Sequence, residues 1–200
     1  MKIIAGLGNP GPSYETTRHN VGFLAVDRLV DVWHARGPAK QYEGEIYQVE
    51  VAGEKVVLIK PQTFMNNSGK CIGSIFHFYK CEPGDLIVIH DDLDLKLHSL
   101  RIKTGGGTGG HNGLKSIDAH LGGGKLNYHR VRVGVGRPEI PGQMSPADYV
   151  LQQYSDDELA GLDPVLDDIE QAIKCLIAGD VSGAQNKFNK DRDAGGVSSK

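Results

Sequence analysis

Apolar residues recur along the chain with two periods, one typical of strands and the other of helices. A short apolar run at residues 3–5 leads into a glycine-rich turn, and from Phe23 to Trp33 apolar residues return at helical spacing. We expect Asn20 to cap this helix and Gly37-Pro38 to end it. In α/β proteins, a strand followed by such a turn builds a site at the carboxyl end of the strand.

The middle of the chain continues to alternate between the two patterns. Residues 45–51 and 55–60 predict two strands joined by a tight turn, and the apolar face at 72–79 predicts a helix. The uninterrupted apolar run at 86–89 is typical of a buried parallel strand.

The second half of the chain follows the same scheme. Two further strands are expected at 100–103 and 130–135, with a helical pattern at 114–121 between them. Residues 155–158 read as a capping box that opens a helical hairpin or a kinked helix, with a break near Pro164.

Strands that alternate with helices predict a single globular α/β domain, with a twisted mixed β-sheet flanked by helices. The sheet is expected to be mixed because the hairpin at 45–60 adds antiparallel strands. We expect the domain to cover residues 1–190. Residues 191–200 are polar and glycine-rich, which predicts a flexible C-terminal tail.

Composition narrows the class of protein. The 200 residues are 39% hydrophobic, and no apolar stretch approaches the about 20 residues that a membrane helix needs. The apolar run at the N-terminus is too short for a signal peptide. The three cysteines form no close pair, which favours reduced thiols and a cytoplasmic location.

The formal net charge of −3 hides an uneven distribution of charge. Between Lys96 and Arg137 there are eight Lys or Arg residues and one acid, whereas between Asp148 and Asp180 there are nine acids and one Lys. The basic stretch suggests a local site for an anion such as a phosphate backbone. Two solvated faces of opposite sign would explain the same distribution.

The opening turn matches the dinucleotide-binding fingerprint at Gly6, Gly8 and Gly11, but its context opposes that interpretation. Prolines on both sides of the third glycine oppose the start of a helix there, which the fingerprint needs. The acid expected about 20 residues later should end a second strand, whereas Asp27 and Asp31 lie inside the first predicted helix. We therefore expect the turn to expose Asn9 instead of holding a cofactor.

Three loop asparagines share this kind of context: Asn9, Asn66 and Asn112. A carboxamide donates and accepts hydrogen bonds without a change of charge, so three of them in one cleft can hold an amide or ester substrate. Each of them alone is also a common turn or capping residue.

His19 is the best candidate for a general base, because the ordinary pKa of histidine suits proton abstraction near neutral pH. Asp91, after the most buried strand, is placed to orient a histidine across the sheet. The alternatives are a surface histidine and a helix-capping aspartate. A metal site with His90, Asp91 and His111 is disfavoured because no ligand spacing recurs, and a Cys–His nucleophile lacks support.

A second glycine-rich run, at residues 105–113, has six glycines in nine residues. It can bring backbone N–H groups close to a phosphate, or it can act as a flexible flap. Four neighbouring cations would supply phosphate contacts: Lys103, Arg130, Arg132 and Arg137. Arg130 and Arg132 are two residues apart on one predicted strand and therefore share a face.

Five motifs in order, between Ile3 and Pro138, resemble bacterial peptidyl-tRNA hydrolase: GLGNPG with TRHNVG, KPQTFMNNSG, HDDLDL, KTGGGTGGHNGLKSI and RVRVGVGRP. The resemblance implies a monomeric enzyme that hydrolyses the ester between a peptide and the 3′ ribose of tRNA, and so recycles tRNA. It implies no metal and no organic cofactor. The partner is peptidyl-tRNA, bound through its acceptor stem and 3′ end, with preference for a blocked α-amine.

The resemblance also implies roles for single residues. His19 corresponds to the catalytic base and Asp91 to the residue that orients it. The peptide and ester site would be lined by Asn9, Asn66 and Asn112, with Tyr14, Phe64, Met65 and His111 as neighbours, and the tRNA 5′ phosphate would be clamped by Lys103 and Arg132. Similar plant splicing factors suggest an alternative, a non-catalytic RNA-binding adaptor, but the retained catalytic residues argue against it. The chain departs from the usual motif at 96–99 and 122–125, outside the catalytic set.

Overall fold

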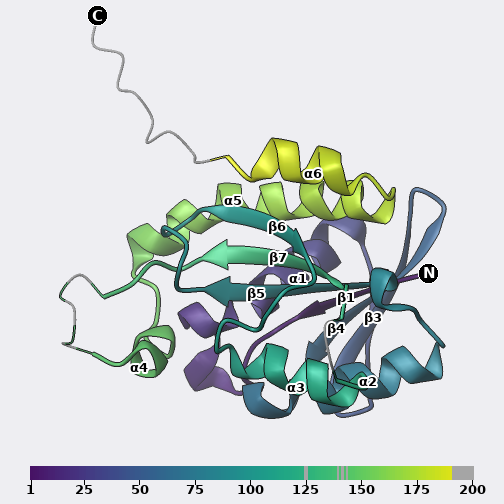
Figure 1. Ribbon diagram of the computed structural model, residues 1–200, viewed down its shortest axis with the longest axis horizontal. Helices are drawn as coiled ribbons and strands as arrows, with labels where there is room; N and C mark the ends of the chain where they lie inside the picture. Colours follow the sequence, from purple (N-terminus) through teal and green to yellow (C-terminus); the bar gives the residue numbers. More distant parts are fainter. Residues whose placement is uncertain (124–125, 139, 141, 143, 191–200) are drawn as a thin grey trace, which may run out of the picture.

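A computed structural model describes residues 1–123, 126–138, 140, 142 and 144–190. These form a seven-stranded sheet with the order β2-β3-β4-β1-β5-β7-β6 (Figure 1). The strands are β1 (Lys2–Gly6), β2 (Arg36–Gln41), β3 (Gly44–Val51), β4 (Glu54–Pro61), β5 (Leu86–Asp92), β6 (Leu100–Thr104) and β7 (His129–Gly134).

The centre of the sheet is parallel and both of its sides are antiparallel. Strand β1 runs parallel to β4 and β5, and β7 runs parallel to β5. Strands β2 and β3 continue the sheet beyond β4 in antiparallel pairing, and β6 closes the other side against β7. The prediction of a twisted mixed sheet in a single α/β domain is therefore confirmed.

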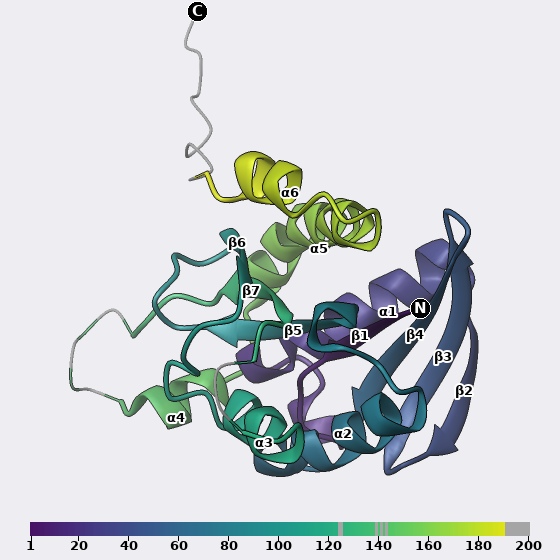
Figure 2. The same ribbon diagram turned by 45° about the vertical axis from the view of Figure 1, so that its right-hand side comes forward.

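Helices cover both faces of the sheet (Figures 1 and 2). On one face lie α1 (Val21–Trp33), α5 (Asp156–Ile177) and α6 (Val181–Phe188), and on the other lie α2 (Ser68–Phe78) and α3 (Asn112–His120). Adjacent residues Ile3 and Ile4 point to opposite faces and are both fully buried. No helix within the described ranges is long and apolar enough to cross a membrane.

The observed elements differ from the predicted ones where contacts between distant segments determine the secondary structure. Helix α1 ends at Trp33, before the predicted end at Gly37-Pro38. Residues 36–41 instead form the edge strand β2, in which every residue is exposed. Such a strand carries no apolar alternation to detect. Helix α5 continues through Pro164, since its buried face at Val165 and Ile169 packs on the core. The predicted tail at 191–200 lies outside the described residues.

Short 3₁₀ helices place the polar motifs at the carboxyl ends of the central strands. One contains Arg18–Asn20 and precedes α1, and another contains Met65–Asn67 and precedes α2. The helix α4 (Pro146–Val150), which the sequence pattern did not predict, comes from the loop after β7. The loops after β1, β4 and β5, the glycine-rich loop before α3, and α4 all line one cleft beside the sheet.

The arrangement of these loops depends on a close approach of α1 to β1 and β5. A Cβ atom at Gly22 would lie 2.3 Å from the backbone nitrogen of Leu7 and 2.6 Å from the carbonyl oxygen of Ile89. The Leu7 N–H itself donates to that Ile89 oxygen at 3.0 Å. Any side chain at Gly22 would therefore separate the helix that follows His19 from the strand that carries Asp91.

We predict that Gly22→Ala lowers the free energy of unfolding by about 1–3 kcal/mol, because it forces backbone apart at this crossing. Helix propensity alone predicts the opposite sign, since alanine is favoured over glycine by up to about 1 kcal/mol. Denaturant unfolding measures the change. The control is Gly84→Ala, an exposed position where a Cβ meets nothing within 4 Å. Equal stability of Gly22→Ala and the parent protein would contradict the close approach.

Candidate active site

A cleft of about 780 Å³ opens where these loops meet. Its walls come from the loops after β1, β4 and β5, from the glycine-rich loop before α3, and from α4. Ten of the eleven predicted site residues line it: Asn9, His19, Phe64, Met65, Asn66, Asp91, Lys103, His111, Asn112 and Arg132. The remaining one, Tyr14, lies edge-on against Phe64, with ring centroids 6.3 Å apart.

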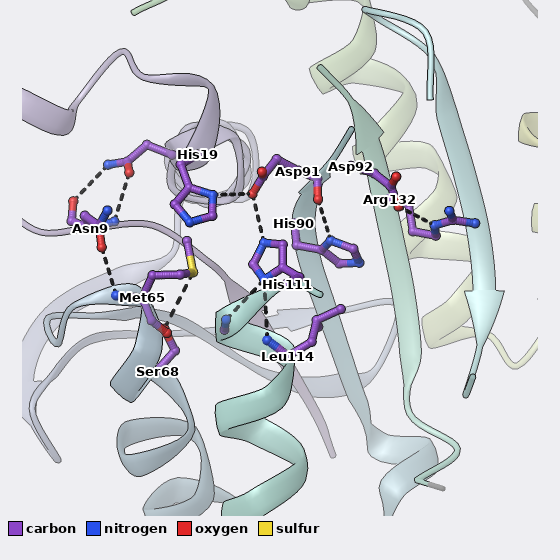
Figure 3. A network of polar contacts seen from close by, with 12 residues as sticks. Asn9, His19, Met65, Ser68, His90, Asp91, Asp92, His111, Leu114 and Arg132 are labelled. Carbon is purple, nitrogen blue, oxygen red and sulfur yellow. Dashed lines mark hydrogen bonds and ion pairs between the residues drawn. The ribbon is translucent and has the colours of Figure 1, made fainter. Parts of the chain in front are cut away.

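Asp91 is the centre of the polar network in this cleft (Figure 3). Its side chain is 3% exposed, and its Oδ1 atom accepts two hydrogen bonds, from Nδ1 of His19 at 2.8 Å and from Nε2 of His111 at 2.9 Å. Burial raises the pKa of this carboxyl, but the two histidines outweigh that effect and hold the pKa well below its ordinary value. Asp91 therefore stays ionised at neutral pH.

The contacts of His111 fix the position of its proton. Nδ1 of His111 faces the backbone N–H groups of Gly113 and Leu114, at 3.2 and 3.4 Å, and can only accept from them. The proton of the neutral ring must then lie on Nε2, which donates to Asp91. His111 thus caps the first turn of α3 with one nitrogen and binds the carboxylate with the other.

His19 has the opposite arrangement. Its Nδ1–H donates to Asp91, so Nε2 of the neutral ring carries a free lone pair. The side chain is 13% exposed and lines the cleft, which gives a substrate access to it. Burial lowers the pKa of His19, but the charge of Asp91 and its hydrogen bond outweigh this, and the net pKa is raised above 6.5.

His90, a neighbour on β5, stays neutral and takes a different role from the one considered in the sequence. Its Nδ1–H donates to the backbone carbonyl of Asp91 at 2.7 Å, and burial lowers its pKa to about 3. The metal-ligating set that the structure does bring together is His19, Asp91 and His111, whose ligand atoms lie within 4.8 Å of one another. A metal on Nε2 of His111 would require loss of the proton that its Nδ1 contacts place there, so this set suits hydrogen bonds better than a metal ion.

Asn9 is buried, 7% exposed, and the prediction that the turn exposes it is wrong. Its Oδ1 accepts from the backbone N–H of Met65 at 2.8 Å, which fixes the orientation of the carboxamide. No described residue bonds its Nδ2 group, which is therefore the donor that Asn9 can offer to the cleft that it lines.

Asn20 and Arg18 are functional residues that the sequence analysis missed. Asn20, 1% exposed, accepts from the backbone N–H of Asn9 and donates to its carbonyl, at 2.8 and 2.9 Å. Its side chain makes no cap bond to α1, contrary to the predicted role. Arg18 binds both carboxylate oxygens of Glu158, at 2.7 and 2.8 Å, and stacks over Tyr149. The two neighbours of His19 thus anchor its loop, and the only sequence signal was their place in one motif.

The exposed side chains form the rim of the cleft. Asn66 and Asn112 are exposed at the starts of α2 and α3, and Phe64 is 56% exposed. All three side chains line the cleft. The structure therefore brings the three predicted asparagines into one cleft, two at its rim and one in its wall.

The predicted phosphate-binding cations divide into distinct environments. Lys103 is exposed, and no carboxylate of the described residues forms an ion pair with it. Arg132 donates from Nε to Asp92 at 2.8 Å, and Arg137 pairs with Asp94. Arg130 is 3% exposed and bonds backbone carbonyls, so the prediction that it contacts phosphate directly is not supported by its burial.

Comparison with known proteins agrees with this geometry. The family model of peptidyl-tRNA hydrolase matches residues 3–195. The chain belongs to this family. A peptidyl-tRNA hydrolase of Anaeromyxobacter sp. (strain K) is 44% identical over 190 residues, which cover 95% of this chain and 97% of that protein. One of Chelativorans sp. (strain BNC1) is 46% identical over 188 residues, which cover 94% of this chain and 76% of that protein.

Solved structures of the family share the fold. The crystal structure of peptidyl-tRNA hydrolase from Acinetobacter baumannii is 35% identical, covers 97% of each chain and superimposes with a TM-score of 0.87. The structure of its Arg119Gln mutant superimposes with a TM-score of 0.88. The prediction that this chain is an enzyme of the peptidyl-tRNA hydrolase family is confirmed.

The electrostatics of the site give a testable titration. We predict that His19 titrates with a pKa above 6.5 and that Asp91→Asn lowers it, because the variant removes the negative charge while burial remains. An NMR titration of the histidine ring protons measures this shift. The control is Asp94→Asn, which removes an exposed carboxylate paired with Arg137. A pKa of His19 that is unchanged in Asp91→Asn would contradict the assigned pairing.

Proposed function

We propose that this protein hydrolyses the ester between a peptide, or an N-blocked aminoacyl group, and the 3′ ribose of tRNA, with water activated by His19. One observation carries the proposal: in a member of this family, a buried carboxylate holds a histidine so that its unprotonated Nε2 is left for the cleft. The activity releases free tRNA and peptide from prematurely released peptidyl-tRNA.

The reaction follows from the positions of the lone pair and the donors. Nε2 of His19 takes a proton from a water molecule as its oxygen attacks the ester carbonyl carbon, and Asp91 stabilises the imidazolium that forms. The charge that develops on the carbonyl oxygen is stabilised by Nδ2 of Asn9, an effect often worth about 3 kcal/mol. When the ester C–O bond breaks, His19 returns the proton to the 3′ oxygen, so the products are a carboxylic acid and a free ribose hydroxyl.

The rim of the cleft supports selection for a blocked α-amine. The exposed carboxamides of Asn66 and Asn112 can both donate to and accept from an amide of the substrate. A free ammonium can only donate, so it leaves the N–H groups of these carboxamides without an acceptor and gains less. Aminoacyl-tRNA with a free amine should accordingly be a poor substrate.

The cations that line the cleft support binding of the tRNA end. We propose that Lys103 and Arg132 hold the 5′ phosphate of the acceptor stem. Of these two, Arg132 is paired with Asp92, whereas Lys103 forms no ion pair with a carboxylate of the described residues. We propose that the protein acts as a monomer, as the resemblance to the family implies. The reduced thiols support a cytoplasmic location. Neither the site nor the relatives favour a non-catalytic RNA-binding adaptor.

We predict that His19→Ala lowers kcat on N-acetyl-aminoacyl-tRNA by about 10²–10⁴-fold, the usual contribution of a positioned general base. Release of the labelled amino acid measures hydrolysis, and a filter-binding assay should show tRNA affinity within about twofold of the parent. The parent protein should cleave the N-acetylated substrate and leave the unblocked one largely intact. Unchanged turnover in His19→Ala would remove this residue from the mechanism.

A second variant separates the donor role of Asn9 from its structural role. In Asn9→Asp the side chain still accepts from the Met65 N–H but offers a negative charge in place of Nδ2. We expect kcat of the folded variant to fall by about 10²-fold or more, and thermal unfolding to report separately the cost of burying the new carboxylate. The matched control is Asn67→Asp, an exposed neighbour outside the cleft lining. Equal losses of kcat in the two variants would contradict the donor role.

A further inference from the structure

Arg130 is a buried cation whose function the proposed reaction leaves open. It lies on β7 and is 3% exposed. Its Nη1 donates to the carbonyl of Gly107 at 2.7 Å and its Nη2 to the carbonyl of Gly106 at 2.6 Å. The guanidinium also lies over the ring of Tyr128, 4.9 Å from the centroid. One side chain thus holds two successive carbonyls of the glycine-rich loop.

The charge of Arg130 is not neutralised by an acid. No carboxylate in the described part of the chain forms an ion pair with it, and its Nε atom is buried without a partner. Burying an unpaired cation is costly, so the arrangement favours an anion near the loop. The backbone N–H groups of residues 106–110 bond no described residue and remain available to such an anion.

The loop in turn sets the position of Lys103. Lys103 is directly opposite Arg130 in the β6–β7 register, so both side chains leave the same face of the sheet. A Cβ at Gly106 would lie 2.7 Å from Cε and from Nζ of Lys103, so the lysine side chain packs directly over this glycine. Gly106 has φ of +90°, a conformation that favours glycine. Arg130 therefore holds the carbonyl of Gly106, and Gly106 in turn lies against the end of the Lys103 side chain.

We infer that Arg130 is a positioning residue for recognition of the tRNA 5′ phosphate. It does not contact the phosphate; it holds the glycine-rich loop so that Lys103 and the free backbone N–H groups face the anion together. This inference rests on the proposed function. It adds that the specificity for a 5′-phosphorylated end depends on a side chain buried beneath the loop.

The test compares two substrates that differ only at the tRNA 5′ end. N-acetyl-aminoacyl-tRNA is used with its 5′ phosphate and after dephosphorylation to a 5′ hydroxyl. For the parent protein we expect KM to be about tenfold lower with the phosphate, as one charge-assisted contact supplies. For Arg130→Gln we expect the two KM values to agree within about twofold, with kcat on both substrates changed less than threefold.

Two further variants make the test decisive. Gly106→Ala keeps Arg130 but places a Cβ against the side chain of Lys103, so it should also abolish the phosphate preference. This variant decides the outcome if thermal unfolding shows that Arg130→Gln does not fold. Arg28→Gln is the matched control, since it also removes one arginine charge, but from a pair with Asp163 and Asp167 on another face. It should keep the tenfold preference.

The outcomes separate this inference from the function on which it rests. If the parent cleaves the substrate and prefers the phosphate, but a folded Arg130→Gln keeps that preference, the positioning role of Arg130 is overturned. Where Arg130→Gln does not fold, a Gly106→Ala variant that keeps the preference overturns it. If the parent cleaves both substrates equally well, the phosphate clamp itself is overturned, and this inference with it. If the parent cleaves neither substrate, the proposed hydrolase activity fails.

Discussion

A single oxygen atom, Oδ1 of Asp91, determines how this site is assembled. It accepts from two histidines that come from different parts of the chain, His19 before α1 and His111 before α3. A buried carboxylate without partners would be costly, and each histidine supplies one of the two donors that offset this cost. The two rings present different nitrogens to this oxygen, because Nδ1 of His111 already accepts from the backbone N–H groups at the start of α3. One histidine becomes a helix cap, and the other keeps a lone pair for the cleft.

The rest of the site complements this lone pair with donors. Asn20 holds the backbone of Asn9 from both sides, and Met65 fixes the Asn9 carboxamide so that its amino group remains free. The cleft therefore has an acceptor at His19 and a donor at Asn9, which is what water attack on an ester carbonyl requires. Both depend on the close crossing of α1 with β1 and β5, where Gly22 has no room for a side chain.

Much of this arrangement could be predicted from the sequence because it rests on local patterns. The buried run at 86–89 predicted strand β5, and the motif residues His19, Asp91 and Asn66 all lie in the cleft. What sequence could not predict depends on partners distant in the chain. The roles of Asn20 and Arg130 are set by backbone atoms of other segments, and backbone carbonyls leave no signature in a sequence. Strand β2 was missed because its exposed side chains carry no period.

The central claim is that Asp91 holds His19 with its proton on Nδ1 and its lone pair on Nε2. The most direct test is a long-range ¹H–¹⁵N correlation spectrum of the protein with labelled histidines, recorded at a pH where His19 is neutral. The account predicts that the Nδ1 atom of His19 is protonated and Nε2 is not, and that His111 shows the reverse. A neutral His19 with its proton on Nε2 would leave no base facing the cleft and would contradict the account.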